Sequence, residues 1–419
     1  MKYCARCLYP ENHPLHLTFD EQGVCSGCRV HEEKDSLDWA PRARKLGNIF
    51  DSYRNKSGNN YDCIVPVSGA RDSYFIVHTV KNVYGMNPLL VTYNKHYNTD
   101  VGIRNLAYLR MQFDCDLLTL TVSPETVKKL TRASLRKMGS LYWHCLAGQT
   151  VFPVQTAVKF KVPLIVWGAH QGIDQVGMFS HLDEVEMTRK YRKEHDLMGF
   201  EAEDLVDEFD GVAEREVVQY LYPSDRELER VGVRGIYLNN YLRWDTKAQH
   251  EQMIREFHYE SLPQTRTFDT YNDVDCFNYS DTHDALKFLK HGYGKATDHA
   301  CREIRLRRMT REEGMRLVSE YSQRPLRNLP AFLKWIGMTE ASFHYIVDQH
   351  RNPDLWKRNA NWDWELKTDL TPHATRELVE AARLPMRESK AEFAITPSRR
   401  PEYKDDKYIL IGKGWVPCH

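Results

Sequence analysis

Short apolar segments alternate with helix-like segments from residue 61 onward, and this alternation most limits the folds that the chain can adopt. Apolar runs occur at "YDCIVPV", "NPLLVTYN", "CDLLTLTV" and "KVPLIVWG". Segments with helical periodicity lie between them, and one begins with Ser123 as N-cap and Pro124 in its first turn. Strands rich in Val, Ile and Leu, separated by helices, predict a parallel sheet covered on both faces. The expected fold class is therefore α/β, with a doubly wound parallel sheet.

The same pattern divides the chain into regions. The alternation is predicted to stop near residue 225, where helices with long connections follow. One of these helices starts at a capping box formed by Thr310 and Glu313, and a helix pair is hinged at Gly337. The expected regions are a cysteine module at 1–48, the sheet domain at 49–225, a mainly helical region at 226–383 and an extended tail at 384–419.

Four of the ten cysteines form two C-x-x-C pairs near the start, Cys4 with Cys7 and Cys25 with Cys28. Two such knuckles can supply four thiolates to one tetrahedral ion, so the spacing predicts a structural zinc site. Two redox pairs or an iron–sulfur cluster are the alternatives. Redox C-x-x-C motifs normally follow a strand and precede a helix, and neither pair is expected to do so.

Charge and hydropathy limit the class of protein. Lys+Arg and Asp+Glu both number 58, so the formal net charge is zero. This balance argues against electrostatic binding of nucleic acid over the whole surface, but it does not exclude a local basic cleft. The N-terminal segment "MKYCARCLYPENHPLHL" has no continuous apolar stretch, and no apolar run approaches the length of a membrane span. We expect a cytoplasmic protein without a membrane span.

The loop after the first predicted strand, "SGARDS", has the parts of a phosphate-binding site. Ser68 and Ser73 offer hydroxyls, Gly69 lets the backbone come close, and Arg71 offers a fork of donors. The next helix adds the free N–H groups of its first turn. The loop is neither a Walker A motif nor a dinucleotide fingerprint. An ordinary polar turn with an N-cap serine explains these six residues equally well.

Two segments resemble motifs of the ATP-pyrophosphatase (PP-loop) superfamily, which includes GMP synthetase and tRNA-thiolating enzymes. "SGARDS" is similar to its SGGxDS pyrophosphate loop, and "VWGAHQGIDQ" (166–175) is similar to its G-H-x-x-D segment. The resemblance implies that ATP is bound, that Asp72 and Asp174 hold Mg²⁺, and that Arg71 acts with these two carboxylates in catalysis. The residues that the resemblance assigns to nucleotide binding are Ser68, Gly69, Ala70, Arg71, Asp72, Ser73, Gly168 and His170.

Two positions depart from the superfamily pattern. Ala70 replaces the second glycine, and Arg71 replaces the usual lysine. Arginine keeps the charge but not the geometry of lysine. Alanine adds a Cβ at a position where a positive φ or a close contact would favour glycine.

From the N-terminal cysteines to about residue 370, the chain resembles the N-acetyl sugar amidotransferases of the WbpG/PseA-like family. The resemblance is carried by "YWHCLAGQ" (142–149), "YLRWD" (241–245) and "KHGYGKATDHACREIRLRRMTREE" (290–313). It implies that the acetamido group of a nucleotide sugar becomes an acetamidino group during synthesis of a surface polysaccharide such as lipopolysaccharide. The basic residues of the last segment suit a sugar-nucleotide diphosphate or a carboxylate, and a solvated basic helix face is the alternative. The candidate substrate-binding residues are Lys295, His299, Arg302 and Arg305, with His291 nearby.

The implied chemistry needs ATP and a source of ammonia. An amide oxygen would attack the α-phosphorus, pyrophosphate would leave, and ammonia would displace AMP from the O-adenylyl imidate. We find no glutaminase signature, since Lys2 stands where an N-terminal cysteine nucleophile would be needed. We therefore expect a separate glutaminase partner. The resemblance implies one like the glutaminase and cyclase subunits of imidazole-glycerol-phosphate synthase, acting with a UDP-acetamido sugar as substrate.

Two other functions stay open. Some tRNA 2-thiolating enzymes join a double C-x-x-C to a pyrophosphatase domain, but they need catalytic cysteines. Cys145 would matter most for that function, as a core residue or as a thiol near the site. A scaffold whose ATPase was lost with Ala70 is the third possibility.

Overall fold

The structure is a computed structural model, and it describes residues 2–15, 17–70, 72–322 and 324–367. The tail expected at 384–419 lies outside the described residues, as do Arg71 and the end of the expected helical region.

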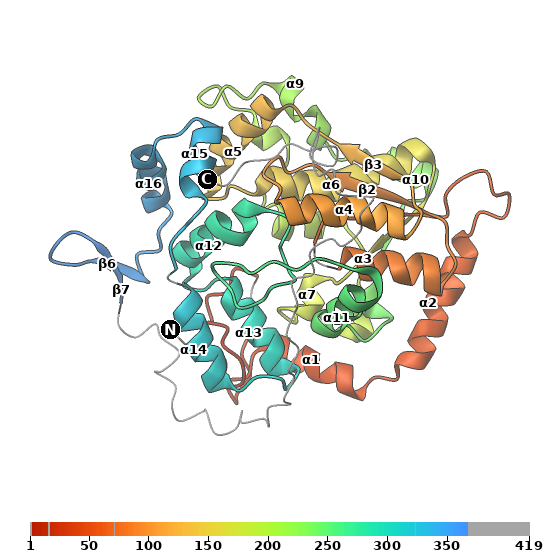
Figure 1. Cartoon of the computed structure of the whole chain (residues 1–419), viewed down its shortest axis with the longest axis horizontal. Helices are drawn as coiled ribbons and strands as arrows, with labels where there is room; N and C mark the ends of the chain where they lie inside the picture. Colours follow the sequence, from red (N-terminus) through yellow and green to blue (C-terminus); the bar gives the residue numbers. More distant parts are fainter. Residues whose placement is uncertain (1, 16, 71, 323, 368–419) are drawn as a thin grey trace.

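Five parallel strands form the central sheet (Figure 1), in the order β3-β2-β1-β4-β5. The strands are β1 (Cys63–Pro66), β2 (Pro88–Tyr93), β3 (Leu117–Leu120), β4 (Leu164–Trp167) and β5 (Arg234–Tyr237). The predicted parallel α/β sheet is confirmed. Strand order reverses between β1 and β4, and ligands bind at such switch points in open α/β sheets.

The prediction that the alternation stops near residue 225 was wrong, because β5 adds one more strand. It pairs with β4 at the edge of the sheet. Its sequence, Arg-Gly-Ile-Tyr, includes a charged residue and a glycine that half-exposed edge positions tolerate. An edge strand of this composition gives little apolar signal.

Alternate residues of β1 face two separate cores. Cys63 and Val65 belong to a cluster with helices α2 (Trp39–Tyr53), α3 (Ser73–Val77), α4 (Asp100–Gln112) and α11 (Thr246–Phe257). Ile64 belongs to a second cluster, which includes residues of α6 (Trp143–Phe160). Helices therefore cover both faces, as expected for a doubly wound sheet.

A third core joins α5 (Pro124–Met138) and α6 to the helices near the end of the described chain. Ser123 is the N-cap of α5 and Pro124 lies in its first turn, as predicted. The predicted helix pair is also present, as α15 (Leu329–Ile336) and α16 (Glu340–Gln349), with Gly337 at φ 71° between them. Figure 1 shows α15 and α16 beside α5.

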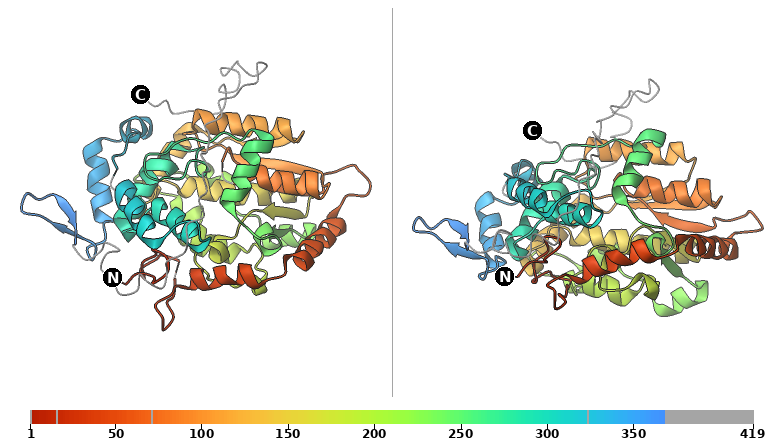
Figure 2. Two further views of the ribbon diagram at one scale, coloured as in Figure 1. Left: turned by 60° about the horizontal axis from the view of Figure 1, so that its bottom comes forward. Right: turned by 90° about the horizontal axis from the view of Figure 1, so that it is seen from below.

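The cysteine segment packs against helices almost 300 residues away in sequence. The N-terminal loops and α1 (Ser26–Ser36) share a core with α13 (Lys295–Arg305) and α14 (Arg311–Ser322). The backbone N–H of Leu8 donates to Cys301 Sγ at 3.3 Å, and Arg311 donates to the carbonyl of Cys7 at 3.1 Å. Figure 2 shows the N-terminal segment against these helices. The cysteine segment is therefore built into the body of the protein.

Thr310 caps α14, since its hydroxyl accepts from the N–H of Glu313 at 3.1 Å.

The remaining elements are short, apart from α12. The other helical elements are η1 (His78–Val83), α7 (Gln171–Asp174), η2 (His181–Asp183), α8 (Arg189–Tyr191), η3 (Arg192–Asp196), η4 (Glu203–Leu205), α9 (Glu214–Val217), η5 (Val218–Tyr220), α10 (Asp225–Val231), η6 (Leu238–Asn240), η7 (Asn278–Thr282) and α12 (His283–His291). A hairpin of β6 (Trp356–Arg358) and β7 (Trp364–Leu366) projects from the body (Figures 1 and 2).

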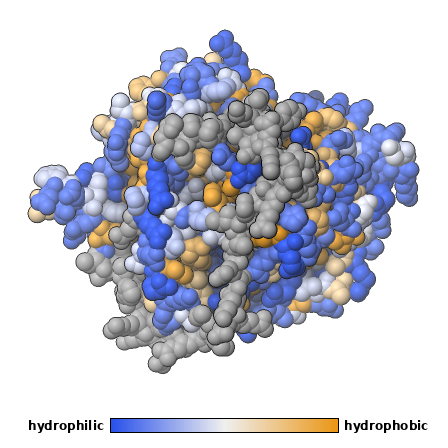
Figure 3. Space-filling model, in the orientation of Figure 1, coloured by the Kyte–Doolittle hydropathy of each residue, from blue (hydrophilic) through white to orange (hydrophobic). Residues whose placement is uncertain are grey.

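The surface is mainly hydrophilic where Figure 3 shows described residues, with small hydrophobic patches between them. Within the described ranges, every helix is too short or too polar to cross a membrane.

Candidate active site

The loop between β1 and α3 is held by its own serines. The N–H of Ser68 donates to Ser73 Oγ at 2.9 Å, and the Ser73 hydroxyl donates to the carbonyl of Ala70 at 3.1 Å. The side chain of Ser68 also lies 3.2 Å from the N–H of Ala70. These bonds fix the loop in a compact shape before any ligand binds.

Gly69 is needed for packing. A Cβ at this position would overlap the carbonyl of Gly102 in α4, and the Gly69 carbonyl accepts from Asn105 Nδ2 at 3.0 Å. The motif predicted that the small size of Gly69 lets a ligand approach the backbone. The structure gives it a second reason, the close contact between this loop and α4.

Ala70 suits its position. It is not among the residues with positive φ, and its methyl group is buried in the core beneath the loop. The backbone at this position therefore does not need the positive φ that would favour glycine. Arg71 lies outside the described residues.

A cavity of about 340 Å³ opens at the carboxyl ends of β1, β2 and β4. Four of the expected nucleotide-binding residues line it together: Ser68, Asp72, Ser73 and Gly168. Tyr93, Gln149 and Trp167 are also in its wall. Segments about 100 residues apart in sequence therefore meet at the switch point of the sheet.

His170 lies apart from this cavity. Its ring is buried among Phe179, Tyr191 and Tyr237, with centroid distances of 5.6, 4.3 and 4.6 Å. Burial lowers the pKa of His170 to about 4. The side chain therefore packs as a neutral aromatic ring, and its assignment to nucleotide binding stays a prediction.

Asp174 forms an ion pair with Lys34, which projects from α1. Burial alone would raise the pKa of Asp174, but the Lys34 ammonium outweighs it and the pKa lies below its ordinary value. Asp174 lines a second cavity next to the first. Its charge is thus already balanced by a lysine from the cysteine segment.

Sequence reasoning missed a buried ion pair in the wall of the first cavity. Lys95 Nζ lies 2.7 Å from Asp275 Oδ2, and both side chains are less than a tenth exposed. Burial lowers the pKa of Lys95, but Asp275 with the nearby thiols of Cys276 and Cys145 raises it above its ordinary value. The two partners are 180 residues apart, so no local pattern joined them.

The second cavity, of about 570 Å³, is lined by both basic and acidic side chains. All four candidate substrate-binding residues line it: Lys295, His299, Arg302 and Arg305. Lys287 and Lys290 add to its charge. Lys295 and His299 are buried in the chain, so the alternative of a solvated basic helix face was wrong.

These basic groups already have protein partners. Lys295 Nζ donates to Gln264 at 2.8 Å, and His299 Nδ1 lies 2.7 Å from Thr267 Oγ1. Arg302 donates to Asp269 at 2.7 Å. These bonds hold the side chains in place around the cavity. The role of these residues in substrate binding stays a prediction.

The four cysteines of the two C-x-x-C pairs meet in one buried cluster. The four Sγ atoms all lie within 4.8 Å of one another. Arg305 donates to Cys25 Sγ at 3.5 Å and lies 3.9 Å from Cys7 Sγ, so a positive charge faces the sulfurs. Four converging thiols beside a guanidinium fit a tetrathiolate metal site, and the cluster could hold zinc.

The cysteine cluster is joined to the loop after β4. Ser26 Oγ donates to the carbonyl of Val176 at 2.7 Å. Gly27 lies so close to the loop that a Cβ there would overlap the Gln175 carbonyl. Together with the ion pair of Asp174, these contacts join the cysteine segment to the wall of the second cavity.

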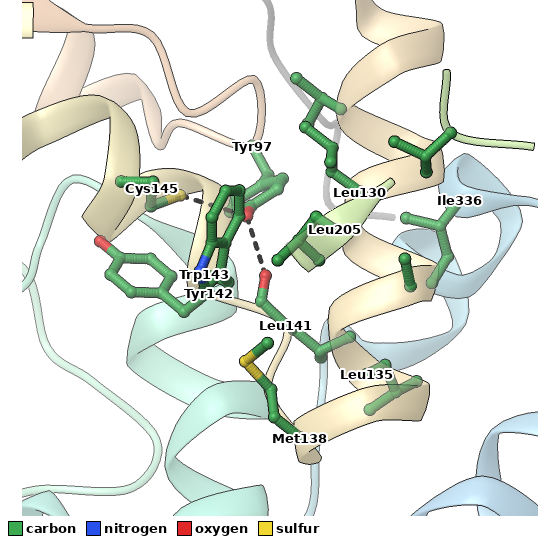
Figure 4. Packing of buried hydrophobic residues seen from close by; sticks show 14 of the residues in the cluster. Tyr97, Leu130, Leu135, Met138, Leu141, Tyr142, Trp143, Cys145, Leu205 and Ile336 are labelled. Carbon is green, nitrogen blue, oxygen red and sulfur yellow. Dashed lines mark hydrogen bonds between the residues drawn. The ribbon is translucent and has the colours of Figure 1, made fainter. Parts of the chain in front are cut away.

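Cys145 is a core residue (Figure 4). Its sulfur lies 3.3 Å from the hydroxyl of Tyr97, and burial raises the pKa of its thiol well above the ordinary value. Among the described residues that line the two cavities there is no cysteine. A thiol-based reaction at this site therefore finds no support in the described part of the chain.

Comparison with known proteins gives two similarities. Residues 265–370 match a family described as "LPS biosynthesis protein WbpG-like, C-terminal domain". This range includes α12 and α13, which supply the lysine and arginine side chains of the second cavity. The match supports a relationship to the WbpG-like family for this region.

The second similarity is to an uncharacterized protein, MJ1599, of Methanocaldococcus jannaschii. The two are 22% identical over 120 residues, which is 28% of this chain and 42% of the relative. The chain thus matches less than half of that protein.

Proposed function

We propose that the protein is an ATP-dependent amidotransferase that converts the acetamido group of a nucleotide sugar into an acetamidino group in lipopolysaccharide or related polysaccharide synthesis. One observation carries this proposal. The serine-rich loop and the basic helix α13 open into adjoining cavities that share Asp72. A nucleotide and an anionic substrate could therefore meet at one wall.

The first cavity suits the nucleotide. It lies at the switch point of the sheet and is lined by two hydroxyls and a carboxylate from the loop, Ser68, Ser73 and Asp72. Asp72 is a candidate Mg²⁺ ligand, because its carboxylate lines this cavity beside the two hydroxyls. Arg71 is expected to act on the phosphates from the same loop.

The second cavity suits a sugar nucleotide with a diphosphate or a carboxylate. Its cations come mainly from α12 and α13, within the region similar to the WbpG-like family. Arginine forks and lysine ammonium groups are the usual partners of such anions. The similarity of residues 265–370 to a family of LPS biosynthesis proteins supports a role in lipopolysaccharide synthesis.

Activation of an amide would proceed by attack of its oxygen on the α-phosphorus of ATP, followed by addition of ammonia. The chain's part would be mostly positioning and charge stabilisation. A separate glutaminase, with a cyclase-like subunit, would supply the ammonia.

The first test is an ATP–pyrophosphate exchange screen across UDP-acetamido sugars. We expect one sugar to stimulate exchange, and mass spectrometry of the product formed with ammonium should show that oxygen has been replaced by NH. Exchange that is independent of every sugar would contradict the proposal. Stimulation by tRNA instead would point to the thiolation alternative.

A further inference from the structure

The two cavities share one wall, and ionisable groups gather there. The residues that line both cavities are Leu15, Asp72, Leu146, Ala169, Gln171, His195, Asp196 and His283. With the nucleotide in one cavity and the sugar in the other, the reacting amide carbon would lie against this wall. The groups on it are therefore in a position to move protons during the reaction.

Asp196 is the last residue of the π-helical turn η3. Such turns are rare and often occur at functional sites. The side chain is half-buried, and within the described parts of the chain no hydrogen bond or ion pair engages its carboxylate. Arg192, a cation of the same turn, is held instead by Glu201 and Thr150, each at 2.9 Å. The carboxylate is thus left to face the cavities.

The surroundings of Asp196 favour proton exchange near neutral pH. Burial raises the pKa of Asp196 to about 7, and the charge of Arg192 offsets only part of this effect. Burial also lowers the pKa of His283 to about 3, so that ring is neutral. The other titratable or charged groups near Asp196 are Asp72, Tyr191, Glu194, His195 and Tyr237.

We propose that Asp196 accepts the proton that ammonia must lose when it adds to the activated amide carbon. This inference rests on the proposed function and assigns a residue to its second half-reaction. A carboxylate at the shared wall can reach both the incoming nitrogen and the carbon that it attacks.

The step balances as follows in atoms and charge. The lone pair of ammonia forms the C–N bond, and the π pair of the protonated imidate moves to the amide nitrogen. The Asp196 carboxylate takes one proton from the new ammonium group. The C–O bond then breaks, AMP leaves with its electron pair, and the nitrogen lone pair forms the amidinium product. The proton on Asp196 passes to water.

The test separates the two half-reactions. Asp196→Asn should keep sugar-stimulated pyrophosphate exchange, while amidine formation from ammonium falls by about 100-fold, within the range for loss of a general base. Asp196→Glu should recover part of the rate. Glu203→Gln, which removes an exposed carboxylate outside both cavities, is the matched control and should change neither reaction.

The pH profile adds a readout that a purely structural role would not change. At a constant concentration of unprotonated ammonia, amidine formation should rise with pH through about 7 as Asp196 loses its proton, and Asp196→Asn should remove this rise. Amidine formation at the normal rate in Asp196→Asn would overturn the assignment, and so would loss of exchange together with amidine formation. Absence of exchange in the unmodified chain would instead contradict the proposed function.

Discussion

Arg305 connects the four-cysteine cluster to the wall of the second cavity. One of its terminal nitrogens lies 3.5 Å from Cys25 Sγ, and the other donates to the carbonyl of Gln175 at 2.5 Å. A single guanidinium thus faces the sulfurs on one side and the loop after β4 on the other. We therefore expect the geometry of this loop to depend on the order of the four-cysteine cluster.

Removal of zinc should therefore increase the mobility of segments that lie far from the cysteines in sequence. We expect about one zinc per chain, because four thiolates complete a tetrahedral shell. Cys25→Ser should lose the metal, and backbone hydrogen exchange should increase in residues 171–177 and in α13 and α14, while β1 and β2 stay protected. Metal analysis and exchange mass spectrometry measure both effects.

Cys115→Ser is the control for that experiment, because Cys115 lies far from the cluster in sequence and its thiol donates to the nearby Phe113 carbonyl at 3.3 Å. It should keep its zinc and its exchange pattern. If hydrogen exchange in Cys25→Ser increased only within residues 1–36, the contacts of Arg305 would not couple the cysteine cluster to the loop after β4.

The loop after β1 gives a pair of contrasting variants. Asp72→Ala should abolish ATP–pyrophosphate exchange if Asp72 bears on magnesium. Ala70→Gly should keep the exchange activity and cost about 1 kcal/mol of stability, because it removes a buried methyl group and adds backbone freedom. Exchange assays and urea unfolding test the two predictions, and a tenfold loss of turnover in Ala70→Gly would mean that the loop geometry is misread.

Lys95 and Asp275 should stabilise the fold only when both charges are present, because either charge alone would be buried without its partner. Asp275→Asn leaves a buried ammonium without its counter-charge and should cost about 3–5 kcal/mol. The double variant Lys95→Met with Asp275→Leu should recover much of this loss. A double-mutant cycle measured by urea unfolding gives the coupling, and additive single effects would argue against a tight pair.

The apolar runs predicted four of the five strands of the sheet, but they did not predict the edge strand β5 or the contacts between distant segments. Strands β1, β2 and β4 were predictable because each is a continuous apolar run that is almost wholly buried. Strand β3 is also an apolar run, although it is partly exposed at one edge of the sheet, whereas β5 at the other edge carries Arg234 and Gly235. The loop residues Ser68, Asp72 and Ser73 could be found because they follow a strand directly.

Contacts between distant segments could not be predicted in the same way. Lys95 with Asp275, and Lys34 with Asp174, are paired by the tertiary fold, and no spacing along the chain reveals them. Asp196 was missed for a related reason. Its surrounding sequence, "YRKEHD", reads as an exposed charged turn, and only the fold places its carboxylate in the shared wall.

His170 should make the protein sensitive to acid. Its folded pKa of about 4 lies below its ordinary value of 6.5, so the unfolded chain takes up the proton first as the pH falls. The stability contribution is therefore present above pH 6.5 and is lost between pH 6.5 and 4, by about 1.4 kcal/mol per pH unit.

His170→Phe should keep the aromatic packing and remove this dependence. Within the described parts of the chain, neither ring nitrogen of His170 has a hydrogen-bond partner, so the substitution should be neutral or stabilising at pH 7.5. At pH 5 the variant should gain about 2 kcal/mol relative to the unmodified chain. Equal differences at the two pH values would mean that the pKa of His170 in the folded chain is close to its ordinary value, and loss of nucleotide binding would support a ligand contact.

The last prediction concerns the source of ammonia. Among the described residues, no cysteine lines either cavity, so the site offers no thiol to hydrolyse glutamine. The chain should therefore be inactive with glutamine alone at neutral pH. It should form product with a glutaminase partner, or with high ammonium at raised pH, where more ammonia is unprotonated. The measurement is product formation from amide-labelled glutamine, with and without the partner, against unlabelled ammonium. Full activity of the isolated chain on glutamine would contradict the prediction, and complete dilution of the label in the presence of the partner would show that ammonia is released to solvent before it reaches the shared wall.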